Sequence, residues 1–329
     1  MAGLKEPCFK KDDFSFLSAD LAEIEKMIQV FDENTPFAVK KAVSYMVDGG
    51  KRIRAMFVCL VGRMCGCSRD NYIKIAVAIE SLHNATLLHD DVIDDASMRR
   101  SKDAVCRLWG NKVSVLSGDY LLSRSLWWMS ATGNVDVVKI LSKASSVIVS
   151  GEILQLSTEG DLVKGCESYF NIITAKTAVL FAAACEAVAV VAGSSSETCK
   201  LFKEFGLNTG VAFQIKDDIL DYVGGNEIGK IVGKDFTERK ITLPVIIAYN
   251  EGCEEERYFW KCYFSGGMDT KDDFSKALSY ISKYDAIDKS TQIAKVYKNK
   301  ASCSVVNFAH NAYYRYLIKL VNIITEREC

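Results

Sequence analysis

Proline is scarce in this sequence of 329 residues, because only Pro7, Pro36 and Pro244 occur. Proline breaks a helix interior, so long uninterrupted helices are permitted nearly everywhere. A surplus of either charge is also absent, since 41 Lys and Arg stand against 42 Asp and Glu and the net charge is -1. A protein that binds the nucleic-acid backbone carries a basic surplus. No nucleic-acid partner is therefore expected.

The sequence shows neither a leader nor a disulfide framework. Residues 1–13 are charged and hold no apolar segment, so neither a signal peptide nor an anchor is expected there. The 12 cysteines are spread over a long chain, unlike those of short secreted scaffolds. We therefore expect a cytoplasmic protein in a reducing compartment. The most apolar stretch, residues 178–192, is interrupted by Glu186 and is short for a bilayer span, which predicts a buried core helix.

Apolar residues recur with the spacing of a helix. Ile75, Ile79, Leu82 and Thr86 follow at steps of four, three and four, which places them on one helix face. The alternation typical of strands is hard to find. Breaks rich in Gly, Ser, Asn and Asp separate stretches of helical length, at 66–70, 132–134, 159–165, 193–196, 224–233 and 265–270. The sequence predicts an all-α helical bundle that forms a single domain over residues 1–329.

Two acidic segments share one spacing in apolar surroundings. LLHDDVIDD and QIKDDILDY each carry carboxylates at i, i+1 and i+4, namely Asp90, Asp91, Asp94 and Asp217, Asp218, Asp221. Positions i and i+4 share a helix face, so each segment forms a two-carboxylate patch. One such triplet could be only a solvated acidic turn, but two in apolar context favour a cation site. Hard oxygen ligands suit Mg2+ shared with substrate phosphates.

Basic residues accompany both acidic segments and the motif GGKRIRA, which places glycines beside cations that could approach a phosphate. Arginine offers a planar fork for phosphate oxygens and lysine a compact charge. Each basic residue alone is more often a surface residue, and only the set indicates an anionic substrate. The set consists of Lys51, Arg52, Arg54, Arg99, Arg100, Lys230, Lys234 and Lys240.

Together these motifs resemble those of the trans-isoprenyl diphosphate synthases, also called polyprenyl synthetases. The similarity covers nearly the whole chain, through GGKRIRA, HNATLLHDDVIDDASMRR, GNKVSVLSGDYLL, GEILQLS, KTAVLFAAACE, FQIKDDILDY and GKDFTERKITLPVI. The resemblance implies the isoprenoid synthase fold, an all-α bundle around a central cavity, usually as a homodimer. It also implies about three Mg2+ ions per site.

The resemblance assigns roles to individual residues. Asp90, Asp94 and Asp217 are expected as metal ligands within the catalytic set of Asp90, Asp91, Asp94, Asp217, Asp218, Asp221 and Lys176. The allylic diphosphate is expected at Arg99, Lys176, Thr177, Gln214, Lys230 and Lys240. Isopentenyl diphosphate is expected at Lys51, Arg54, His83 and Arg100. Three positions depart from the family pattern: Ala55 stands for the usual Pro, and Ser101 and Arg239 stand for the usual Gly.

The residues that precede Asp90 on the same helix predict the product length. Ala85 and Thr86 lie one turn below the acidic patch and are small, and Leu82 follows on the next turn. In the family, bulky residues at the first two positions accompany short products. We therefore expect a long-chain synthase of the octaprenyl to decaprenyl kind that feeds quinone side chains, with geranylgeranyl or farnesyl synthesis as the alternative. Release of so apolar a product implies transient membrane contact.

Other interpretations fit less well. Glu80 and His83 form an E-x-x-H, but a ferritin-like site needs a second such motif, which is absent. A terpene cyclase would carry Asn, Ser and Glu in its second motif, where this chain has DDILD. A regulatory subunit of a heteromeric prenyl synthase tends to lose its aspartates, which are intact here. Cys65 and Cys67 lack a second pair at the spacing of a zinc site.

Overall fold

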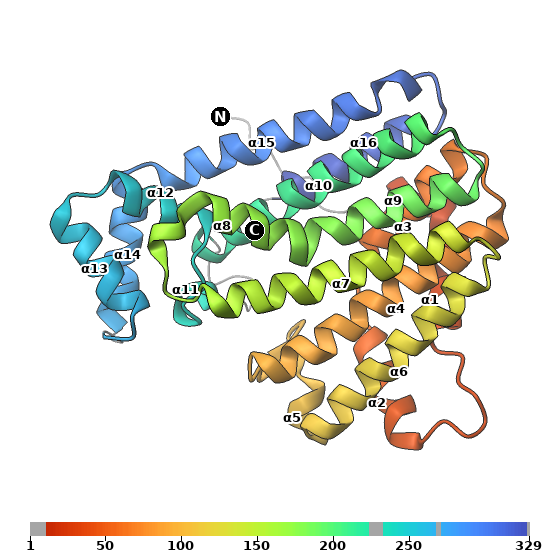
Figure 1. Cartoon of the computed structure of the whole chain (residues 1–329), viewed down its shortest axis with the longest axis horizontal. Helices are drawn as coiled ribbons and strands as arrows, with labels where there is room; N and C mark the ends of the chain where they lie inside the picture. The colour runs from red at the N-terminus through yellow and green to blue at the C-terminus, as the bar shows by residue number, and fades with distance from the viewer. Residues whose placement is uncertain (1–10, 224–232, 268–270, 328–329) are drawn as a thin grey trace.

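The structure, a computed structural model, describes residues 11–223, 233–267 and 271–327. Helices make up almost all of this part, which confirms the predicted all-α class (Figure 1). The order is η1 Lys11–Leu17, α1 Ser18–Ile28, α2 Phe37–Val47, α3 Ile53–Met64, α4 Arg69–Ile93, β1 Met98–Arg99, β2 Lys102–Asp103, α5 Val105–Trp109, α6 Asn111–Ser130, α7 Val135–Ser157, η2 Leu162–Lys164, α8 Gly165–Ile173, η3 Thr174–Ala178, α9 Val179–Val191, α10 Ser196–Val223, α11 Lys234–Thr237, α12 Leu243–Glu251, α13 Glu254–Phe264, α14 Lys271–Lys283, α15 Ala286–Ser304, η5 Val306–Phe308 and α16 Tyr314–Thr325.

The breaks between helices fall where the sequence places turn residues. Helix α3 ends before the break at 66–70, and Ser68 then caps α4 by accepting a hydrogen bond from the Asn71 N–H at 3.4 Å. The breaks at 132–134 and 193–196 likewise separate α6 from α7 and α9 from α10. Most of the break at 224–233 lies outside the described residues. The described breaks confirm the boundaries because glycine tolerates the conformations in which helices end.

Helix α4 is the central element of the larger apolar core. It packs against α1, α3, α6 and α9 (Figure 1). Ile75, Ile79 and Leu82 of the predicted stripe are at most 1% exposed. Burial extends around most of this helix, because neighbours cover it on several sides. The long helix that carries the first acidic segment is thus held on all these sides, which fixes its carboxyl-terminal end.

Helix α9 is the buried core helix predicted for residues 178–192. Its residues from Leu180 to Cys185 are all buried. The stretch Leu162–Val191 is long and apolar enough to cross a membrane by length and composition, but 61% of its most apolar window is buried inside the protein. Gly210 lets α10 cross close to this stretch, since a Cβ there would lie 2.5 Å from the Ala178 Cα. That crossing places the second acidic segment.

A second apolar cluster surrounds Trp260 and joins α12, α13 and α14. It includes Phe236 on α11, whose ring stacks on that of Tyr263 with centroids 4.0 Å apart. This cluster therefore anchors the short helix that follows the second acidic segment. The single domain over residues 1–329 stays a prediction.

Candidate active site

The two acidic segments lie at the carboxyl-terminal ends of two long helices. Asp90 and Asp91 lie in the last turn of α4, with Asp94 at its C-cap, and residues 217–221 lie in the last two turns of α10. Helices α4, α7 and α10 run in the same direction and end on the side where α11 lies (Figure 1). The fold thus brings both predicted acidic segments to one end of the bundle.

Within the first acidic segment the three carboxylates have different surroundings. Asp91 is fully buried, and Arg99 donates to its Oδ1 from Nε at 2.8 Å. Asp94 forms an ion pair with Lys240, with Nζ and Oδ2 3.3 Å apart. Burial and the charge of Glu152 raise the pKa of Asp90 to about 7. Asp90 and Asp94 therefore form the predicted patch, while Asp91 holds Arg99 in place.

The second acidic segment is divided in the same way. Asp218 is 4% exposed and accepts hydrogen bonds from the Tyr169 hydroxyl at 2.6 Å and the Gln214 amide at 2.8 Å. Asp221 accepts from the backbone N–H groups of Lys234 and Asp235, and so caps α11. Asp217 instead pairs with Arg327, with Oδ1 and Nη2 2.8 Å apart.

Helix regularity breaks where the predicted Lys176 and Thr177 lie. Residues Thr174–Ala178 form a π-helical turn, a feature that often marks functional sites. Lys176 Nζ lies 2.7 Å from Glu152 Oε2 and donates to Gln155 Oε1 at 2.8 Å. Thr177 donates to Gln214 Oε1 at 2.7 Å. These contacts connect α7, the π-turn and α10, so a cation and a hydroxyl lie between the two acidic segments.

Lys240 links the region after α11 to the first acidic segment. Its Nζ lies 2.8 Å from Glu238 Oε2 as well as near Asp94. Burial lowers the pKa of Lys240, but the Glu238 hydrogen bond and the Asp94 charge outweigh burial and raise it. Lys240 therefore stays a cation. The predicted Lys230 lies outside the described residues.

The residues predicted for isopentenyl diphosphate gather between α3, α4 and the turn after β1. Arg100 donates to the Met46 carbonyl at 3.0 Å. Burial, then the charges of Arg54 and Arg100, holds the pKa of His83 well below its usual range. Lys51 is exposed at the edge of this group. The guanidinium groups of Arg52 and Arg100 pack against Gly50, where a Cβ would lie 2.3 Å from Arg52 Nη1.

The predicted product-length residues lie on α4 below the first acidic segment. Ala85 is 2% exposed and Leu82 1%, whereas Thr86 is half-buried and donates from its hydroxyl to the His83 carbonyl at 2.9 Å. Neither Ala85 nor Thr86 presents a ring. The side chains at this level of α4 are small, and their role in limiting the product stays a prediction.

Two of the three departures from the family pattern, Ser101 and Arg239, have the backbone conformation that glycine would adopt. Arg100 and Ser101, with φ of 52° and 60°, form the two-residue turn between β1 and β2, and two positive φ values are typical of a type I′ turn. Arg239 has a φ of 56°. Both positions where the family usually has Gly thus adopt the left-handed conformation that glycine favours. Ala55 lies in the first turn of α3.

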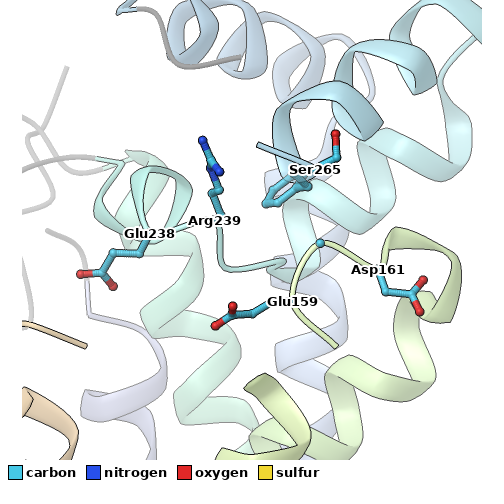
Figure 2. Close-up of a pocket in the computed structure, with 7 residues that line it drawn as sticks. Glu159, Asp161, Glu238, Arg239 and Ser265 are labelled. Carbon is cyan, nitrogen blue, oxygen red and sulfur yellow. The ribbon is translucent and has the colours of Figure 1, made fainter. Parts of the chain in front are cut away.

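A cavity of about 660 Å³ lies beside Glu238 and Arg239 (Figure 2). Its lining consists of Glu159, Gly160, Asp161, Glu238, Arg239, Phe264 and Ser265. Figure 2 shows Arg239 extending away from Glu159 and Glu238. Glu238, which binds Lys240, is the link between this cavity and the acidic ends of α4 and α10. Among the described residues, none that the sequence assigns to substrate or metal lines it.

Sequence reasoning missed several polar side chains that contact the predicted set. Glu152 and Gln155 lie one turn apart on α7 and both contact Lys176. Tyr169 holds Asp218. Asp235 is half-buried, and desolvation and the charge of Asp221 raise its pKa to about 7. The i, i+3 spacing of Glu and Gln in GEILQLS could have indicated a shared helix face. No comparable local signal marks Tyr169.

The family model described as Polyprenyl synthetase matches residues 37–281. The chain belongs to the polyprenyl synthetase family. It is 35% identical over 286 residues to the octaprenyl diphosphate synthase of Escherichia coli (strain K12), covering 86% of this chain and 88% of that protein. The decaprenyl diphosphate synthase structure from Rhodobacter capsulatus superposes with a TM-score of 0.91 at 35% identity, covering 97% of this chain and 99% of that one. A polyprenyl synthase from Caulobacter crescentus CB15, complexed with calcium and isoprenyl diphosphate, gives 0.89 at 36% identity, with coverages of 97% and 98%.

These similarities confirm three predictions from the sequence. The family, the isoprenoid synthase fold and prenyl transfer as the reaction class are those expected from the motifs. The relatives named octaprenyl and decaprenyl diphosphate synthases favour the long-chain interpretation over geranylgeranyl or farnesyl synthesis. This polyprenyl synthetase is accordingly a prenyltransferase.

Proposed function

We propose that this polyprenyl synthetase condenses isopentenyl diphosphate with an allylic diphosphate, with Mg2+, to an all-trans polyprenyl diphosphate of octaprenyl-like length. One observation carries the proposal: Asp90 and Asp94, and Asp217, lie at one end of the bundle with Lys240 and Lys176 between their helices. Two acidic patches with intervening cations suit a diphosphate held together with metal.

The carboxylates fit a divalent cation. Burial and Glu152 raise the pKa of Asp90, so the carboxylate is held where its charge is insufficiently compensated. We assign Asp90, Asp94 and Asp217 as ligands, because Asp91, Asp218 and Asp221 already hold scaffold groups. When bound, Mg2+ supplies Lewis-acid stabilisation of the charge that develops on the leaving diphosphate. About three ions per site is part of the proposal.

We assign the allylic diphosphate to Arg99, Lys176, Thr177, Gln214 and Lys240, together with Lys230. Glu152 and Gln155 hold Lys176 in the π-turn, so its ammonium is positioned before substrate arrives. Positioned cations in a site shielded from water stabilise leaving-group charge without further reorganisation. The C–O bond of the allylic substrate can then break with its electron pair on the diphosphate.

Isopentenyl diphosphate is assigned to Lys51, Arg54, His83 and Arg100. The charges around His83 in this group are those of arginines, which suits a diphosphate bound without metal. Its alkene attacks the allylic cation, a C–C bond forms, and a proton leaves the new cation. We assign that proton to the released diphosphate, which is the nearest anion that the reaction itself creates.

The product is proposed to grow along α4, past Ala85, Thr86 and Leu82. Helix α4 begins at Arg69, so about 30 Å of helix lies below Asp90. The first turn of this wall carries small side chains.

We also propose transient membrane contact at product release. Every cysteine that the structure describes is free, which supports a reducing, cytoplasmic compartment.

A homodimer is proposed through α6 and α7. These helices pack together and expose large apolar side chains: Leu116 is 60% exposed, Trp127 51%, Val149 56% and Ile153 61%. An exposed patch of this kind marks an interaction surface. The deciding feature is the stretch of α7 from Ala144 to Gly151, which carries no charge and so suits a second copy of the same helix.

The experiment that tests the function is incubation of the purified protein with Mg2+, labelled isopentenyl diphosphate and farnesyl diphosphate. The products are then dephosphorylated and sized by chromatography. A ladder that ends well beyond geranylgeranyl supports the reaction and the product length. A stop at geranylgeranyl keeps the reaction and overturns the length. No incorporation would overturn the proposal and favour the regulatory-subunit interpretation.

A further inference from the structure

Glu80 of the E-x-x-H pattern has no role in the reaction as assigned so far, yet its carboxylate is buried beside the isopentenyl diphosphate residues. It is 3% exposed on α4, one turn before His83. Its Oε1 accepts a hydrogen bond from the Ala55 N–H at 3.0 Å. Its Oε2 lies 3.8 Å from Arg52 Nη1. Glu80 thus ties α4 to the first turn of α3.

Three guanidinium groups crowd around this carboxylate. Arg52 is 4% exposed, pairs with Glu25 at 3.0 Å, and its Nη1 has no hydrogen-bond partner among the described residues. Burial lowers the pKa of Arg54 to about 10, and the charge of Glu80 opposes that shift. Burial and Arg52 likewise lower the pKa of Arg100, again opposed by Glu80. Glu25 is 46% exposed, so the buried Glu80 is the stronger counter-charge.

We propose that Glu80 is a positioning residue for isopentenyl diphosphate: its charge offsets the mutual repulsion of Arg52, Arg54 and Arg100. The proposal rests on the assigned subsite. Without Glu80, Arg52 keeps Glu25 and the Val47 carbonyl as partners, but the guanidinium groups of Arg52, Arg54 and Arg100 lose a buried counter-charge. Arg52 and Arg100 both lie against Gly50, next to Lys51, so stronger repulsion between these two arginines acts where Lys51 is presented.

Ala55 separates the two possible duties of Glu80. The family usually has proline at this position, and proline has no N–H to donate. Ala55 is the third residue of α3, where a helix N–H often lacks a helical partner. In this chain Glu80 therefore satisfies that N–H, while its charge balances the arginines. If charge is the essential duty, the hydrogen bond is dispensable.

The test compares Glu80→Gln, which keeps an acceptor for Ala55 but removes the charge, with Ala55→Pro, which removes the donor but keeps the charge. We expect Glu80→Gln to raise the KM for isopentenyl diphosphate about tenfold, with the KM for farnesyl diphosphate and kcat changed less. Ala55→Pro should leave both KM values within about twofold. Calorimetric titration with isopentenyl diphosphate alone should show the same order of affinities.

Several outcomes overturn the proposal. A lower KM for isopentenyl diphosphate in Glu80→Gln would mean that Glu80 acts only as a repelling charge, and an equal rise for both substrates would mean a general structural role. If Glu80→Gln does not fold, Glu80→Asp decides, because it keeps the charge but withdraws the carboxylate. A KM for isopentenyl diphosphate raised about tenfold in Glu80→Asp would then contradict the proposal, because the charge that the proposal requires is still present. Wild-type enzyme without product formation would instead overturn the proposed function.

Discussion

At the scale of single residues, the six aspartates divide into two groups with different duties. Asp90→Asn should lower kcat by about 10²-fold or more, because it weakens a metal ligand, while stability changes little. Asp91→Asn should instead lower the free energy of unfolding by about 2 kcal/mol, because it leaves Arg99 without its buried partner. Steady-state kinetics gives kcat, and urea unfolding gives the free energy of unfolding, for both variants. Loss of stability in Asp90→Asn with normal turnover would contradict the division.

Arg327 predicts a competition at Asp217. Its Nη2 lies 2.8 Å from Asp217 Oδ1, where the proposal places a metal ligand, so cation binding must displace this ion pair. Arg327→Ala should therefore tighten Mn2+ binding about two- to fivefold, the equivalent of a partly exposed ion pair. Electron paramagnetic resonance of free Mn2+ measures the affinity without turnover. Arg315→Ala, an exposed arginine on α16, is the control, and equal affinities in both variants would contradict the competition.

The grouping of the two acidic segments could be predicted from the sequence, but the contacts that distinguish their carboxylates could not. The spacing of Asp90 with Asp94 follows from helix geometry, so the patch was predictable. The partners that occupy the other carboxylates lie far away in sequence, as Tyr169 does from Asp218. A pattern within one segment holds no information on such a contact. The residue-level site was therefore predicted as a set, and its internal order required the fold.

At the scale of elements, Glu256 joins α13 to α14. It accepts hydrogen bonds from Lys283 at 2.7 Å and from the Tyr284 hydroxyl at 2.5 Å. These two hydrogen bonds lower the pKa of Glu256 from 4.5 to about 2. A carboxylate whose pKa is lowered in the folded state stabilises the protein at pH values above the pKa that it has in the unfolded state. This stabilisation is lost as the pH falls from about 4.5 toward 2.

The Glu256→Gln variant should therefore melt at a lower temperature than wild type at pH 7. The difference in melting temperature between the two proteins should narrow as the pH falls below about 4.5. Thermal unfolding followed by circular dichroism at several pH values measures this difference. Glu255→Gln is the matched control, since Glu255 is the exposed neighbour on the same helix. If both variants showed the same difference at every pH, the ion pair would not be the cause.

Helix boundaries were predictable because they depend on local sequence. Glycine favours the backbone conformations in which helices end, and few prolines interrupt the stretches between the breaks. The π-turn at Thr174–Ala178 was not, since its residues continue an ordinary helical pattern. Gly151 lies against it, and a Cβ there would lie 2.6 Å from the Ala175 Cβ. The turn thus depends on how α7 packs on it. Packing between elements, rather than local preference, decides such irregularities.

At the scale of the whole molecule, the apolar side chains on α6 and α7 predict the oligomeric state. Ile153→Glu should convert the dimer to a monomer, because a charge at 61% exposed Ile153 would be buried by the partner. Light scattering after size exclusion measures the mass. Val306→Glu is the control, since Val306 is 54% exposed on η5. A dimer that persists in Ile153→Glu would place the interface elsewhere.

The proposed growth of the product along α4 predicts that side chains on this helix limit its length. Ala85→Phe and Thr86→Phe should each shorten the product, because a ring one turn below Asp90 meets the chain after few additions. Ala85 is nearly fully buried, so overpacking there costs about 1–3 kcal/mol, whereas half-buried Thr86 tolerates the ring better. Chromatographic sizing of products from folded variants measures the effect, and Thr86→Val keeps the volume small as the control. Because growth stops only where the wall is closed, an unchanged length in Thr86→Phe would place the limiting contact on another helix.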